Sequence, residues 1–197
     1  NTPSRAWRGR GLPASAKVCW FDRQPATLTH ISQFCQSTHG LRVNRHDAIV
    51  KMMGSSLAKQ GLKTVREARL EAGNRKFLIP DLVCTSRDKK KIYILDPIIS
   101  SESKELEEVA VQKAVKYGGA QLQASARRKI LGDAAKSEPV TAAGVAFNAR
   151  GACSRSTGKL VRKLFPRNYG NFIALRILVS TARMVQAFRR CTHLSRS

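Results

Sequence analysis

The chain has 197 residues, of which 42% are hydrophobic, so it can bury a sizeable core and is not globally disordered. Lys and Arg number 36 against 13 Asp and Glu, and the formal charge of +23 predicts an acidic polymer as partner, above all nucleic acid. No apolar run approaches the roughly 20 residues that cross a bilayer, so no membrane partner is predicted. The five cysteines are odd in number and widely spaced, which favours a reducing compartment over a disulfide framework.

Residues 1–17 are rich in Arg, Ser, Gly and Pro, and we interpret them as a basic flexible arm or a plain linker. Arg5, Arg8 and Arg10 supply the charge of this segment, which has little to bury. The chain begins with Asn rather than Met, so we expect a fragment of a longer polypeptide.

Residues 18–40 contain metal-ligand residue types at the spacing Cys-x2-Asp-x7-His-x4-Cys, namely Cys19, Asp22, His30 and Cys35. This spacing predicts a zinc-knuckle-like unit in which Asp22 replaces the second cysteine, with a short helix from Thr27. Thiolate is preferred over carboxylate in structural zinc sites, so His39 is an alternative fourth ligand, and a metal-free unit with buried cysteines is an alternative structure. Trp20 and Phe21 either stack on nucleic-acid bases or pack within the unit.

The rest of the chain alternates between helix and strand patterns. Asn44 is a good N-cap for a helix that continues to about Gln60, where Gly61 suits the C′ position. Strands are predicted at 64–70, 77–84, 92–99 and 140–147, and helices at 101–117, 120–131, 155–164 and 172–190. This order predicts an α/β fold with a mixed central sheet flanked by helices.

Two neighbouring strands carry one acid each at the ends that a hairpin brings together, because Asp81 opens the first and Asp96 closes the second. Seven of the 13 acids lie between Asp81 and Glu108, so the remainder of the chain is more basic than the average. Paired carboxylates suit a hard Mg²⁺ or Mn²⁺ ion. On the following helix Lys113 and Lys116 share one face and can orient or deprotonate a water. The pattern predicts a metal-dependent nuclease.

This arrangement resembles the PD-(D/E)xK nuclease superfamily, the fold of many restriction enzymes. Pro80-Asp81 matches the first element of that motif, and Asp96 matches the second. The superfamily usually places its lysine two residues after the second acid, a position that Ile98 occupies here. Lys113 and Lys116 are therefore the candidate substitutes.

A longer series of motifs resembles the C-terminal region of site-specific non-LTR retrotransposon polyproteins, the kind that insert into ribosomal RNA genes. The series is Leu28-Thr29-His30-Ile31-x-Gln33-x-Cys35-x-x-Thr38-His39-Gly40, then Arg42-Val43-x-Arg45-His46-Asp47, then Pro80-Asp81-Leu82-Val83. Residues 149–153 and 156–164 look like the closing element of that family, although the family usually has an aromatic where Cys153 stands. The family places a zinc knuckle before a restriction-like endonuclease, which implies a nuclease core at 41–150 and a basic helical element at 151–197.

In that family the reverse transcriptase domain lies upstream in the same polypeptide. The endonuclease nicks one strand of the target, and the freed 3′-hydroxyl primes reverse transcription of the element RNA. The resemblance therefore implies a DNA endonuclease that acts on double-stranded DNA in the nucleus. It also implies a parent polyprotein with RNA-directed DNA polymerase activity, which binds the element RNA.

The same resemblance implies roles for individual residues. The two aspartates of the hairpin would hold Mg²⁺ or Mn²⁺, with Lys113 the first candidate for the catalytic lysine and Lys116 the second. The two knuckle cysteines and the knuckle histidine would hold Zn²⁺. Arg45 and His46 either contact DNA at the start of a helix or serve its structure.

Two other classes of function stay open at the level of sequence. A DNA- or RNA-binding module without catalysis, such as a decayed nuclease, would use the basic segments and dispense with Asp81 and Asp96. A basic structural protein of a ribonucleoprotein would need neither a metal nor paired acids. The concentration of acids around the hairpin favours the nuclease, because carboxylates that meet DNA need a metal between the like charges.

Overall fold

The fold is built on a four-stranded sheet in the computed structural model, which describes residues 18–88, 90–132 and 138–194. The predicted basic arm at 1–17 lies outside the described residues. The strands, in the order β1-β4-β5-β6, are Thr64–Arg66, Leu82–Thr85, Ile92–Ser100 and Val140–Asn148. The β1–β4 and β4–β5 pairs are antiparallel, whereas β5 and β6 run parallel, so the predicted mixed sheet is confirmed.

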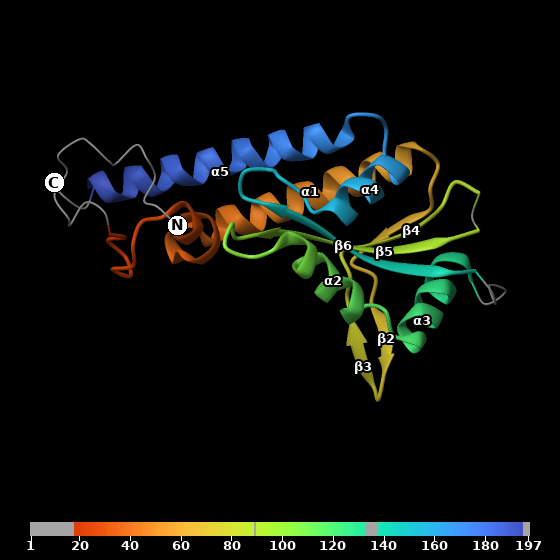
Figure 1. Cartoon of the computed structure of the whole chain (residues 1–197). Coiled ribbons are helices and arrows are strands. Elements are labelled where there is room, and N and C mark those ends of the chain that lie inside the picture. Colours follow the sequence, from red (N-terminus) through yellow and green to blue (C-terminus); the bar gives the residue numbers. More distant parts are fainter. Residues whose placement is uncertain (1–17, 89, 133–137, 195–197) are drawn as a thin grey trace.

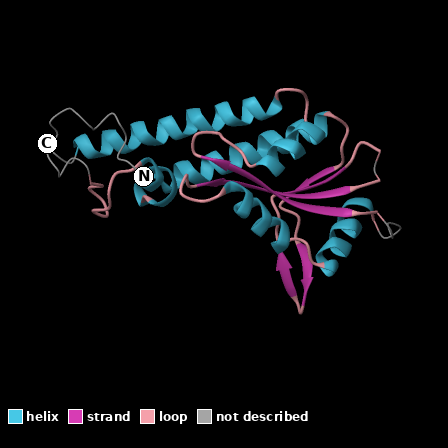
Figure 2. Ribbon diagram, viewed as in Figure 1, coloured by secondary structure: helices cyan, strands magenta, loops and turns pink. Residues whose placement is uncertain are grey.

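Helices cover both faces of this sheet (Figure 1, Figure 2). One face carries α1 (His39–Lys59), α4 (Arg155–Leu164) and α5 (Tyr169–Leu194), and the other carries α2 (Leu106–Lys116) and α3 (Ala120–Leu131). Side chains of a strand alternate between the two faces, so Leu95 joins the core under α1 and α5, whereas Ile94 joins the core under α3. The near-continuous apolar run of β5 is explained by burial on both of its faces.

The predicted strand at 77–84 is wrong as a single element, because the chain divides at Pro80. Its first part, β3 (Lys76–Leu78), pairs with β2 (Leu70–Gly73) in a separate two-stranded ribbon. Its second part is β4, which begins only at Leu82. Proline has no N–H to donate to a ladder, so the buried Pro80 separates the two strand pairings. Asp81 then lies immediately before the first residue of β4.

The first long helix, α1, begins at His39, six residues before the start at Arg45 that Asn44 as N-cap predicted. The side chain of its N-cap Thr38 is buried and donates to the Ile31 carbonyl oxygen at 2.6 Å, which ties the start of α1 to the preceding short helix. Asn44 therefore lies inside the helix. The predicted end is confirmed, since Gly61 follows the C-cap with φ +78°.

The knuckle unit packs against the last turns of α5. It contains a β-bridge between Val18 and Pro25, the π-helical turn η3 (His30–Phe34) and the 3₁₀ turn η4 (Gln36–Thr38). Its small core includes Met184 and Phe188 of α5. In the described part of the chain, no helix combines the length and apolar character that crossing a membrane would require.

Candidate active site and candidate zinc site

Asp81 and Asp96 lie next to each other because of strand register. The β4–β5 ladder ends with the pair Leu82–Leu95, and the next residues beyond it are Asp81 and Asp96, whose side chains interact. Asp96 is 4% exposed, and the Asp81 side chain is 20% exposed. The structure thus brings together the two acids that the sequence analysis singled out, at a place where both are largely removed from water.

Lys113 is the lysine that reaches this pair. Its Nζ lies 2.9 Å from Asp96 Oδ2, and its side chain is 27% exposed. Lys116 is exposed, and its Nζ lies 4.8 Å from the centroid of the Tyr117 ring. Of the two candidates on α2, only Lys113 contacts a carboxylate in the described residues.

Gly144 lets α2 approach the sheet closely enough for that contact. It is the β6 partner of Asp96 in the parallel ladder. A Cβ at this position would lie 2.5 Å from the Ala110 carbonyl oxygen and 2.7 Å from Lys113 Cβ. Sequence reasoning did not identify Gly144. The only sequence signal is a glycine inside an apolar strand pattern, which often marks close backbone approach.

His46 faces the same carboxylates from α1. Its Nε2 lies 3.2 Å from Asp81 Oδ2 and 3.2 Å from the Pro97 carbonyl oxygen. The contact with Asp81 raises the pKa of His46 to about 9, although burial acts in the opposite direction. His46 was predicted either to contact DNA or to serve the helix, and in the structure its side chain lies beside the carboxylates.

Arg45, the other residue predicted to contact DNA, is 3% exposed. Its Nη1 donates to Thr181 Oγ1 and its Nη2 to the Ser32 carbonyl oxygen, both at 3.0 Å. Burial lowers the pKa of Arg45 to about 10. These contacts join α1, α5 and the knuckle unit, so the geometry supports the structural alternative for Arg45 and offers nucleic acid little access to it.

The two carboxylates differ in their electrostatics. Burial raises the pKa of Asp96, the neighbouring Asp81 raises it further, and Lys113 opposes both effects. Burial acts in the same direction on Asp81, but the contact with His46 leaves the pKa of Asp81 below its usual range. The buried Tyr117 has a raised pKa because of burial and the nearby Asp96. Such a pair of unlike carboxylates beside a lysine is typical of sites that hold a proton or a cation.

The donor set at this site suits a hard divalent cation. Asp81 and Asp96 supply carboxylate oxygens. The Pro97 carbonyl oxygen lies near them, because His46 Nε2 is 3.2 Å from both that oxygen and Asp81 Oδ2. Asp81 Oδ2 is buried, and among the described residues it makes no well-directed hydrogen bond. An oxygen-rich site with two adjacent carboxylates favours Mg²⁺ or Mn²⁺ over softer metals.

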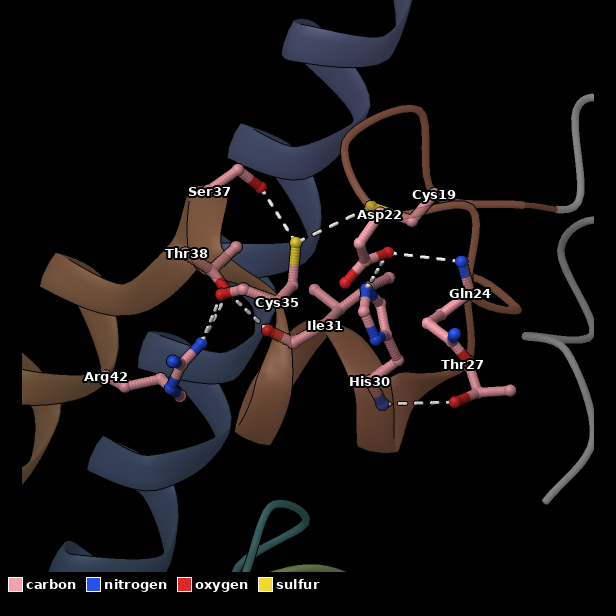
Figure 3. A network of polar contacts seen from close by, with 10 residues as sticks. All are labelled: Cys19, Asp22, Gln24, Thr27, His30, Ile31, Cys35, Ser37, Thr38 and Arg42. Atoms are coloured by element: carbon pink, nitrogen blue, oxygen red, sulfur yellow. Dashed lines mark hydrogen bonds and ion pairs between the residues drawn. The ribbon is translucent and has the colours of Figure 1, made fainter.

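The predicted zinc ligands also lie together (Figure 3). Cys19, His30 and Cys35 are buried, and their ligand atoms all lie within 4.8 Å of one another. The two Sγ atoms are 3.7 Å apart. Four ligands placed tetrahedrally at the usual Zn–S distance would have sulfur atoms about 3.8 Å apart, so the observed spacing already fits the metal.

Asp22 lies beside the histidine of this cluster but outside the group of ligand atoms that all lie within 4.8 Å of one another. Its Oδ1 lies 3.4 Å from His30 Nε2, which is buried and lacks a hydrogen-bond partner among the described residues. A tetrahedral zinc site predicts about 3.4 Å between an oxygen and a nitrogen ligand. The alternative ligand His39 is exposed, and its Nδ1 lies 3.3 Å from Arg42 Nη2. The geometry therefore favours Asp22 over His39.

Comparison with known proteins points to mobile elements. No protein-family model matches the chain. It is 29% identical over 130 residues to the retrovirus-related Pol polyprotein from the type-2 retrotransposable element R2DM of Drosophila melanogaster, which covers 65% of this chain and 12% of that polyprotein. It is also similar to two Pol polyproteins from the type-1 retrotransposable element R2. That of Nasonia vitripennis is 39% identical over 93 residues, which is 46% of this chain and 9% of the polyprotein. That of Popillia japonica is 38% identical over 56 residues, which is 28% of this chain and 13% of the polyprotein.

The chain therefore spans only about a tenth of the length of the curated relatives it matches. These partial similarities support its interpretation as a segment of a non-LTR retrotransposon Pol polyprotein.

Proposed function

We propose that this chain is a metal-dependent endonuclease domain with a PD-(D/E)xK-like fold, part of a retrotransposon Pol polyprotein that also contains an upstream reverse transcriptase. It acts in the nucleus on double-stranded target DNA. It nicks one strand, and the freed 3′-hydroxyl primes reverse transcription of the element RNA bound by the parent polyprotein.

One observation carries this proposal, namely the contact of Lys113 with Asp96 beside Asp81 and His46. Four titratable side chains, from α1, α2, β5 and the residue just before β4, meet at one place. The formal charge of +23 would draw a DNA backbone to the domain, while the carboxylates would repel it unless a cation lay between them. A purely structural or DNA-binding protein has no need of this arrangement.

The chemistry follows from the positions of these groups. Asp81 and Asp96 would hold Mg²⁺ or Mn²⁺, which when bound neutralises the charge on the phosphoryl oxygens. Lys113 lies where it can orient a water or, after it has released its own proton to solvent, accept a proton from that water as the water oxygen bonds to phosphorus. The bond from phosphorus to the 3′-oxygen breaks, and that oxygen takes up a proton from solvent. His46 restrains the Asp81 carboxylate through its contact at 3.2 Å.

The knuckle would hold Zn²⁺ in a structural role through its three buried ligands and Asp22. Bound zinc would link the turn at Cys19 to the end of η3 at Cys35. Gln33 of the same unit donates to the Ser100 carbonyl oxygen at the end of β5, at 3.2 Å. The metal would therefore help hold the knuckle in place against the sheet that carries Asp96.

Nicking of supercoiled plasmid with Mg²⁺ or Mn²⁺ tests the nuclease, with wild type compared to Asp96→Ala. We expect metal-dependent nicking that Asp96→Ala reduces by at least ~100-fold with DNA binding retained. Asp88→Ala is the matched control, because Asp88 lies in the turn of the same hairpin and is exposed. Equal nicking by wild type and Asp96→Ala, or none by either, would contradict the proposal and favour a non-catalytic binding module.

A further inference from the structure

Helix α5 carries apolar residues on two opposite faces. Its inner face packs onto the rest of the molecule through buried side chains, namely Ile173, Ile177, Thr181, Met184 and Phe188. Successive residues of an α-helix are rotated by about 100°, so a second set of residues points the opposite way. This outer set is exposed and consists of Phe172, Leu175, Val179 and Ala182. In Figure 1, α5 lies along the outer edge of the molecule.

The outer set, which we call the outer seam, has the spacing of a helix that pairs with another helix. Its four residues are three, four and three positions apart, as the a and d positions of a coiled-coil heptad are. Phe172 is 61% exposed, Leu175 58% and Val179 39%. Leu178, at the neighbouring g position, is also exposed and widens the seam. A contiguous exposed apolar surface of this kind often marks a contact with a partner.

A row of arginines borders the outer seam on one side. Arg176, Arg183 and Arg190 follow one another at intervals of seven residues, so all three take the e position of the same heptad. They are exposed, and none of them forms an ion pair within the described part of the chain. Charged residues at e positions pair with charges of the facing helix and so select the partner. The row therefore favours a partner helix with acidic residues.

A second copy of α5 cannot supply these acids. No Asp or Glu follows Glu138 in the sequence, so α4 and α5 carry none. Two antiparallel copies of α5 would place e positions against e positions, and hence arginine against arginine. Two parallel copies would place each arginine against a g position, and those positions hold Asn171, Leu178 and Val185.

From these observations we propose that the outer seam of α5 is a docking site for an amphipathic helix that lies outside this chain and carries Asp or Glu beside its own apolar stripe. Burial of Phe172, Leu175 and Val179 supplies most of the affinity, whereas the arginine row selects the acidic partner. Duplex DNA fits this surface less well, because it would meet the arginines but leave the apolar seam in water. The docking site goes beyond the proposed nuclease, since α5 carries none of the residues of the carboxylate site.

Binding of synthetic peptides to the full 197-residue chain tests the proposal by fluorescence anisotropy. The first probe is a labelled heptad peptide with Leu at a and d and Glu at e and g, and its twin has Lys in place of every Glu. A third peptide has the composition of the first but with its leucines moved off heptad spacing, which controls for general attraction to the charge of +23. We expect the first peptide to bind and the other two to bind weakly or not at all.

Two variants of α5 separate the apolar from the charged contribution. Leu175→Asp should weaken binding of the Glu peptide ~10- to 150-fold, which is the loss expected when a buried Leu side chain is removed from the contact. Arg183→Glu should weaken binding of the Glu peptide about fivefold and improve binding of the Lys twin. Thermal melting checks that each variant is folded.

Val115→Asp is the matched control, because Val115 is 74% exposed and lies on α2, at the other face of the sheet. It should bind the Glu peptide as wild type does. Equal binding of the first and third peptides, or wild-type binding by Leu175→Asp, would overturn the proposal. So would loss of self-association in sedimentation of Leu175→Asp, which would make a second copy the occupant, or loss of its DNA affinity without peptide binding by wild type, which would assign the seam to nucleic acid. The peptide assay contains neither DNA nor a nuclease metal, so its result is independent of the plasmid assay.

Discussion

Replacing Gly144 with alanine tests how the position of α2 controls the carboxylate site. The added Cβ would lie 2.5 Å from the Ala110 carbonyl oxygen and 2.7 Å from Lys113 Cβ. Non-bonded heavy atoms prefer separations of about 3.5 Å or more, so α2 would have to retreat by about 1 Å. A retreat of that size would lengthen the 2.9 Å contact between Lys113 Nζ and Asp96 Oδ2 beyond hydrogen-bond range.

The expected effects concern both activity and stability. A misplacement of about 1 Å at a catalytic group costs about 100-fold in rate, so Gly144→Ala should nick supercoiled plasmid about 100-fold more slowly than wild type. Overpacking should also lower the free energy of unfolding in urea by about 1–3 kcal/mol. Both quantities are measured on the same preparations, with DNA affinity as a check that the variant is folded.

Gly119→Ala is the matched control, because an added Cβ at Gly119 meets no atom within 4 Å and its φ of −64° suits any residue. It should leave nicking and unfolding near the wild-type values. Wild-type nicking by Gly144→Ala would refute the reasoning, since it would show that the close approach of α2 to β6 does not set the geometry of Lys113.

Three further predictions concern other residues of the two sites. Lys113→Gln should slow nicking by ~100-fold or more, whereas the nicking rate of Lys116→Gln should stay within a few-fold of wild type. An equal effect of both substitutions would argue against Lys113 as the proton-transfer group. Asp22→Ala should weaken Zn²⁺ binding about tenfold or more, whereas Asp22→Cys should tighten it and strengthen the sulfur charge-transfer absorption of bound Co²⁺. Unchanged metal binding in both variants would exclude Asp22 as a ligand. His46 has a pKa raised to about 9 from 6.5, so its contribution to stability is complete below about pH 6.5 and is lost as the pH rises through 9. Without divalent metal, the melting temperature of wild type should therefore fall more between pH 7 and 9.5 than that of His46→Asn, and parallel curves would show that the ion pair with Asp81 does not form.

Local sequence pattern alone predicted most of the secondary structure. The helices predicted at 120–131 and 155–164 match α3 and α4, and the apolar runs around Asp96 and Gly144 match β5 and β6. Hydrogen bonding and side-chain periodicity within an element depend on near neighbours, so single elements can be read from a linear sequence. The division at Pro80 and the early start of α1 were missed, because each depends on partners outside the element itself.

The pairing of Asp81 with Asp96 was within reach of the sequence, because a short hairpin sets its own register. The choice of Lys113 over Lys116, the approach of His46 to Asp81 and the burial of Arg45 were not. Each depends on how a helix is rotated and how closely it packs against the sheet, and for α2 that distance is set by the missing side chain at Gly144. The amino-acid sequence by itself therefore determined which chemical groups and elements this protein has, whereas packing between segments far apart in the chain decided which of those groups meet.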